Sequence, residues 1–115
     1  MPIKIDQSLV AVPSESKIPG DVTLKQTIHT TNTSEPVQIN YALSPTNNIV
    51  FVEGGITTKS VTRGEVLTPS GKQIAHQVSL KYTDSGTAVA WVLVTQTIID
   101  SRKRKSTDVC KILLL

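Results

Sequence analysis

The sequence predicts an all-β fold, a single antiparallel Greek-key sandwich of about seven to eight strands, with a small β-barrel as the alternative. Three observations predict it. Val, Ile and Thr number 13, 11 and 15 among 115 residues, and such β-branched side chains suit a pleated, half-buried surface. Apolar and polar residues alternate along several segments. Pro, Gly or Asn interrupts the chain at short intervals, as loops between strands require. The length fits one domain over residues 1–115.

The clearest strand covers residues 22–29, where Val22, Leu24, Gln26 and Ile28 alternate with polar neighbours. Period-two alternation places these four side chains on the core face. The same pattern assigns further residues to the core, namely Val37, Ile39, Tyr41, Leu43, Ile74, His76, Val78, Leu80 and Tyr82. Other strands are expected over residues 1–12 (broken near Gln7), 49–52 and 60–67 (interrupted by Gly64).

Residues 87–99 form the most apolar segment. A helix is the competing interpretation, but the β-branched content and the flanking turns favour a strand. Apolar residues on both of its faces indicate a central strand, or an edge strand covered by a partner. The basic run at 102–105 is then a loop, and residues 109–115 form the last strand.

Residues 80–90 contain the turn Asp84-Ser85-Gly86. This segment resembles the approach to strand F of immunoglobulin-type domains, which carry an Asp-x-Gly-x-Tyr-x-Cys pattern there. Asp84 and Gly86 match, whereas Ala88 and Ala90 stand at the tyrosine and cysteine positions. The resemblance implies an immunoglobulin-like sandwich without a disulfide, of the kind that acts in adhesion, spacing or protein contact. From the residues alone, Asp84 is expected to be a turn residue that caps its own backbone.

Side chains for catalysis are scarce, and we predict that the protein is not an enzyme. The only imidazoles are His29 and His76, which alternation places on a solvent face and a core face. Cys110 is the only cysteine, and a small half-buried filler in the last strand is favoured over a reactive thiol. These three residues match no zinc spacing. No cofactor, metal or small-molecule substrate is indicated.

The basic run Arg102-Lys103-Arg104-Lys105 is the feature with the clearest physical case for binding. The net charge is only +3, so the positive field is local. Four adjacent cations at a hairpin tip repel one another, and a polyanion would relieve that repulsion. Nucleic acid, an anionic lipid surface or an acidic protein would serve. The alternative is a solvated loop that keeps the hairpin edge unpaired.

Trp91 is either an interface anchor on an exposed face or the largest core residue. Because aromatic residues make up only 3% of the chain, the core is favoured. The end of the chain is apolar on both faces, since Cys110, Ile112 and Leu114 alternate with Leu113 and Leu115. Such an end must be covered by the protein's own core or by a second copy.

The leading functional prediction is therefore a non-catalytic structural or protein-interaction module that associates with itself or another protein. Trp91, Leu113 and Leu115 in the C-terminal hairpin are its expected contact residues. The alternative is a polyanion-binding domain that uses Arg102, Lys103, Arg104 and Lys105. No transmembrane segment or signal peptide is recognised. We expect a soluble protein, cytoplasmic if the chain is complete and extracellular or on a virion surface if it is a fragment.

Overall fold

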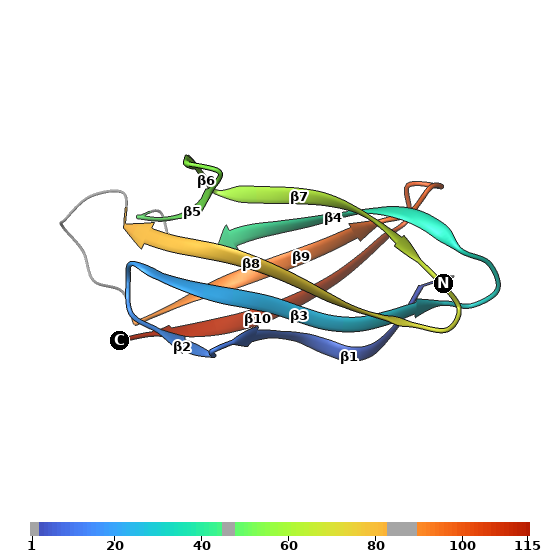
Figure 1. Ribbon diagram of the computed structural model, residues 1–115, viewed down its shortest axis with the longest axis horizontal. Helices are drawn as coiled ribbons and strands as arrows, with labels where there is room; N and C mark the ends of the chain where they lie inside the picture. The colour runs from blue at the N-terminus through green and yellow to red at the C-terminus, as the bar shows by residue number, and fades with distance from the viewer. Residues whose placement is uncertain (1–2, 45–47, 83–89) are drawn as a thin grey trace.

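The protein consists of two packed β-sheets (Figure 1). The computed structural model describes residues 3–44, 48–82 and 90–115, which form ten strands and no helix. The strands are β1 (Ile3–Val12), β2 (Glu15–Ser16), β3 (Gly20–Thr30), β4 (Glu35–Ser44), β5 (Ile49–Glu53), β6 (Ile56–Thr58), β7 (Ser60–Leu67), β8 (Lys72–Tyr82), β9 (Trp91–Ile99) and β10 (Lys105–Leu114). The all-β prediction is confirmed.

One sheet has the order β1-β3-β8-β5-β6 and the other the order β2-β10-β9-β4-β7. Immunoglobulin-type sandwiches place strands A, B, E and D in one sheet and C, F and G in the other. The orders β1-β3-β8-β5 and β10-β9-β4 follow that arrangement, and β7 is added beside β4. The motif at Asp84 and Gly86, between β8 and β9, lies outside the described residues.

The strand count exceeds the prediction because β2 and β6 are only two and three residues long. All described strand pairs are antiparallel except the short pair between β2 and β10. β7 runs through Gly64 without a break, which corrects the expected interruption. β1 shows two shifts of register around Gln7, as the expected break there indicates.

The core forms where the inner faces of the two sheets meet, and alternation correctly identifies most of its members. His76 and Tyr82, also expected in the core, are only partly buried. Leu24, Ile39 and Ile98 are completely buried. Gln26 is also buried, as expected from its place in the pattern. β9 lies between β10 and β4, so the prediction of a central strand is confirmed. Its inner set is Val92, Val94, Gln96 and Ile98.

Asp108 of β10 connects the two sheets along one side of the sandwich. Its Oδ2 accepts hydrogen bonds from the backbone N–H of Leu9, at 2.8 Å, and from Nε2 of Gln26, at 3.3 Å. The edge strand β1 therefore curls toward β10, although no strand ladder joins them. The protein is therefore a sandwich of two separate sheets that is partly closed on one side, and not a closed barrel.

Candidate functional site

The hairpin of β9 and β10 carries both surfaces that the sequence singles out, one at each of its ends (Figure 1). The turn at residues 100–104 presents the basic run. The opposite end pairs Trp91 with Leu113. The molecule measures 49 Å along its longest axis, so the two surfaces are well separated.

Asp100 organises the basic turn. Its Oδ1 accepts the backbone N–H groups of Arg102 and Arg104 at 2.9 and 2.8 Å, and its Oδ2 accepts Nε of Arg104 at 2.8 Å. Burial alone would raise the pKa of Asp100. The hydrogen bonds from Arg104 and Arg102 outweigh that effect and hold the pKa below its usual value of 3.8. Aspartate thus fixes the turn as a charged group.

The fold divides the basic run into two pairs, one on each side of the hairpin. Arg102 and Arg104 line one hollow, and Lys103 and Lys105 line another. Lys103 adopts a left-handed backbone with φ of 64°, which reverses the chain between the two arginines. Lys105 is the first residue of β10 and not part of the loop, which corrects the predicted boundary.

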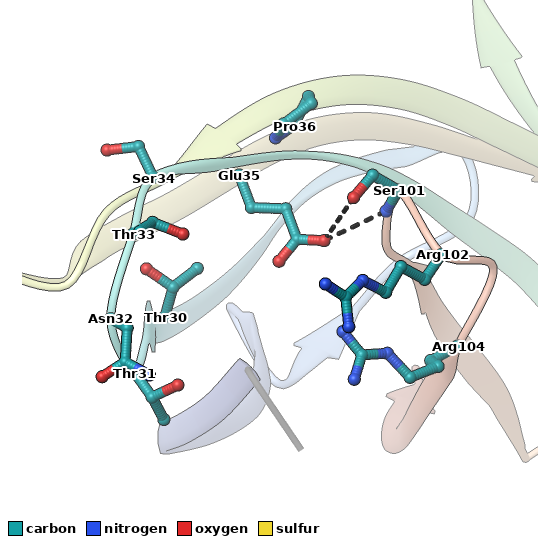
Figure 2. A pocket seen from close by; sticks show the side chains of 10 residues that line it. All are labelled: Thr30, Thr31, Asn32, Thr33, Ser34, Glu35, Pro36, Ser101, Arg102 and Arg104. Carbon is teal, nitrogen blue, oxygen red and sulfur yellow. Dashed lines mark hydrogen bonds between the residues drawn. The ribbon is translucent and has the colours of Figure 1, made fainter.

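The hollow beside the arginines measures about 340 Å³. Figure 2 shows that its wall comes from two segments far apart in the chain, the β3–β4 connection and the β9–β10 turn. Its lining residues are Thr30, Thr31, Asn32, Thr33, Ser34, Glu35, Pro36, Ser101, Arg102 and Arg104. The two segments are tied together by Glu35, whose Oε1 accepts the N–H and the hydroxyl of Ser101 at 3.1 and 2.7 Å.

Sequence reasoning identified the basic half of this hollow and missed the other half. In the sequence, residues 30–36 are polar and show no signal beyond that of a loop between two strands. They reach the turn because Gln38 of β4 pairs with Ile99 of β9, and that pairing cannot be read from either segment alone.

At the other end of the hairpin, Trp91 is 37% exposed, so the favoured placement in the core is wrong. Val92 and Val94 occupy the core instead, and period two then turns Trp91 and Leu93 outward. Nζ of Lys111 lies 4.9 Å from the centroid of the Trp91 ring, within the range of a cation–π contact.

Leu113 and Leu115 are 42% and 72% exposed, and Val109 is exposed on the same face of β10. We call Trp91, Leu93, Val109, Leu113 and Leu115 the apolar patch. The inward side of the strand is covered by the protein's own core, since Cys110 and Ile112 are buried. The strand edge is also covered. The N–H of Leu113 donates to Ser14 and that of Leu115 to Ser16.

The two histidines lie on different faces of their sheet, as predicted. Nδ1 of His29 is 2.7 Å from Oδ2 of Asp6 on the outer face. His76 is turned toward the core, with Nδ1 3.3 Å from Arg63 and Nε2 3.2 Å from Glu53. Burial, together with Arg63 and against the effect of Glu53, lowers the pKa of His76.

Cys110 is buried, and burial raises the pKa of its thiol to about 11, with a further contribution from Asp108. Such a thiol is protonated at neutral pH and is a poor nucleophile. Within residues 3–44, 48–82 and 90–115, no three side chains of His, Cys, Asp or Glu are grouped closely enough to hold a metal ion. The same residues include no helix that could cross a membrane.

Comparisons with known proteins find relatives by structure only. No family model and no curated protein sequence matches the chain. The N-terminal domain of the adhesin Sgo0707 from Streptococcus gordonii is similar over 97% of this chain and 33% of its own, with a TM-score of 0.65 and 17% identity. The sporulation control protein Spo0M from Bacillus subtilis is similar over 99% of this chain and 49% of its own, with a TM-score of 0.63 and 13% identity.

A third similar structure is the alkylpurine DNA glycosylase AlkC from Pseudomonas fluorescens, solved with DNA. It covers 98% of this chain and 30% of its own, with a TM-score of 0.62 and 14% identity. The chain therefore spans less than half the length of each of these proteins. At such identities the likeness establishes a shared β-sandwich fold and no shared activity.

Proposed function

We propose that this chain is a non-catalytic interaction module that binds a second copy of itself through the apolar patch. The observation that carries the proposal is the row of exposed apolar side chains on adjacent strands, where Trp91 lies directly opposite Leu113 in the ladder. Contiguous exposed apolar surface is costly in water and is typical of interaction sites. Trp is also the residue type most enriched at binding hot spots.

A second copy is favoured as the occupant because the patch is bordered by charges of both signs. Lys111 lies on the patch face of β10, and Glu15 of β2 is exposed beside Leu113. In an interface with twofold symmetry the same surface meets itself, so that Lys111 of one copy can face Glu15 of the other. A patch bordered by both charges suits binding to a second copy better than binding to a partner that carries charge of one sign.

The non-catalytic part of the proposal is supported by the chemistry of the titratable groups. His29 and His76 point away from each other, and Cys110 is buried with a raised pKa. None of the three has the arrangement of nucleophile, base and orienting group that acyl transfer requires. The adhesin domain with the same fold is consistent with a role in contact, but the DNA glycosylase is an enzyme, so the fold by itself carries no function.

Analytical ultracentrifugation over a wide concentration range tests the proposal. We expect a monomer–dimer equilibrium for the wild type. Leu113→Ser should raise the dimer dissociation constant by about tenfold or more, as expected when a central apolar contact is lost. Val66→Ser is the matched control, because Val66 is an exposed apolar residue on β7, away from the patch. A wild type that stays monomeric, or equal effects of the two substitutions, would contradict self-association.

A further inference from the structure

We infer that the hollow between the β3–β4 connection and the β9–β10 turn binds a small sugar that carries a phosphate or sulfate group. Arg102 and Arg104 would hold the anionic group, and the polar wall at residues 30–35 would hold the hydroxyl groups. This site lies at the opposite end of the hairpin from the apolar patch and goes beyond the proposed self-association.

The arginines supply the first argument. Both guanidinium groups project into the same hollow (Figure 2). Arg104 donates through Nε to Asp100, and no described residue accepts a hydrogen bond from the terminal nitrogens of either arginine. Two cations that share one hollow repel each other, and an oxyanion between them removes that repulsion and gains charge-assisted hydrogen bonds.

Thr30 supplies an independent argument. It is only 1% exposed and lines the hollow, yet its Oγ1 has no hydrogen-bond partner among the described residues. A buried hydroxyl without a partner is unfavourable, because it has given up its hydrogen bonds to water and gained none in the protein. A polar ligand group in the hollow would satisfy this hydroxyl.

Glu35 limits which anionic ligands the hollow can bind. Its Oε1 accepts both hydrogen bonds from Ser101, and its second oxygen accepts none from the described residues. A carboxylate in the wall repels a bare polyanion but accepts a hydrogen bond from a hydroxyl group. The ligand therefore combines an anionic group with hydroxyl donors.

The rest of the wall fits the same ligand. Thr31, Asn32, Thr33 and Ser34 offer both donors and acceptors through their side chains. The volume of about 340 Å³ lies at the lower end of small-ligand pockets, which range over about 300–1,000 Å³. A phosphorylated or sulfated monosaccharide matches both the size and the polarity.

Isothermal titration calorimetry with glucose 6-phosphate, glucose 6-sulfate, inorganic phosphate and glucose tests the inference. At least one of the two anionic sugars should bind more tightly than inorganic phosphate, and the better of the two identifies the preferred group. Glucose should bind far more weakly than either. Arg102→Gln should weaken binding by about tenfold, as the loss of a charge-assisted hydrogen bond predicts.

The chain offers a matched control in Lys103→Gln combined with Lys105→Gln. This double variant removes twice the positive charge of Arg102→Gln, but from the other side of the hairpin. It should change the affinity less than Arg102→Gln does. If the double variant weakens binding more, or if only a long polymer such as heparin or single-stranded DNA binds, the basic run acts as a diffuse polyelectrolyte surface and the inference is wrong.

Thr30→Val separates a ligand contact from a structural role. Val has nearly the shape of Thr and removes an unpartnered hydroxyl, so the unfolding temperature without ligand should stay the same or rise. The affinity for the anionic sugar should nevertheless fall. Wild-type affinity in this variant, or no binding of either sugar to the wild type, would overturn the proposal. Leu113→Ser should leave sugar binding intact, which keeps this test separate from that of self-association.

Discussion

At the scale of single residues, Asp100 determines the shape of the basic turn. One carboxylate accepts two backbone N–H groups and one guanidinium Nε, so that it orients Arg104 and leaves the terminal nitrogens of that side chain available. The turn is ordered by this aspartate, although Lys103 occupies a left-handed position that favours Gly or Asn. The basic run therefore has a defined conformation, in which the side chains hold fixed positions relative to one another.

Asp100→Asn should destabilise the protein at pH 7, because an amide keeps the acceptor for the backbone but loses the ion pair with Arg104. The pKa of Asp100 is lowered in the folded state, so its stabilising effect is present above the usual value of 3.8 and is lost as the pH falls below it. Thermal unfolding midpoints of wild type and variant should therefore converge at low pH. Asp21→Asn, which changes an exposed carboxyl on β3 outside both proposed surfaces, is the control. A difference for Asp100→Asn that stays constant across pH would contradict the assignment.

Cys110 should react slowly with iodoacetamide in the folded protein. A pKa of about 11 in place of 9.0 lowers the thiolate fraction near neutral pH about a hundredfold, before the effect of burial on access is counted. Mass spectrometry of the protein alkylated with and without denaturant measures this ratio. Equal rates in the two states would show that the thiol is accessible and unperturbed.

At the scale of elements, the side where β1 curls toward β10 depends on one side chain. The two strands belong to different sheets and are not joined by backbone hydrogen bonds of a ladder. The hydrogen bonds that Asp108 accepts from Leu9 and Gln26 connect them instead. The buried N–H of Leu9 has no strand partner opposite it, because β1 shifts register between Gln7 and Val10.

Asp108→Ala should lower the free energy of unfolding by about 1–3 kcal/mol, because it leaves the N–H of Leu9 and the amide of Gln26 without an acceptor. Urea unfolding measures the change. Thr107→Ala, one residue earlier and exposed on the outer face, should cost much less. Similar losses for the two variants would mean that the side chain of Asp108 does not join the sheets.

At the scale of the whole molecule, the apolar patch and the hollow lie at opposite ends of a 49 Å sandwich. A dimer formed through the patch would therefore leave both hollows open to solvent. The two proposed activities are compatible in one assembly, and each can be removed without the other.

Trp91 gives a direct signal for such a dimer, since it is the only tryptophan of the chain. Its fluorescence emission should shift to shorter wavelength as the protein concentration rises, because association removes the half-exposed ring from water. The midpoint should agree with the dissociation constant from ultracentrifugation, and Leu113→Ser should move both to higher concentration. Emission that does not change with concentration would contradict burial of Trp91 in the dimer.

The features of this protein that could be predicted from the sequence are those that depend on short segments of the chain. β3 and β4 were predicted with their inner faces, because Val22, Leu24, Ile39 and Tyr41 alternate with polar residues and only one face can be buried. The basic turn was predicted because four charged residues between two apolar strands have no place in a core. The hollow was not predicted, since it needs the pairing of β4 with β9 to bring Glu35 to Ser101.

Composition and period-two alternation predicted the fold class, the positions of the long strands along the chain and the scarcity of catalytic groups, because these are properties of short segments. Which face of β9 is buried depends on how the two sheets pack against each other. Both faces of that strand carry apolar residues, so local alternation could not choose between them. In the folded protein the face with Val92, Val94 and Ile98 is buried. Gln96 lies on the same face, where its Nε2 donates a hydrogen bond to the hydroxyl of Tyr41 at 3.4 Å. Trp91 was thereby turned toward solvent.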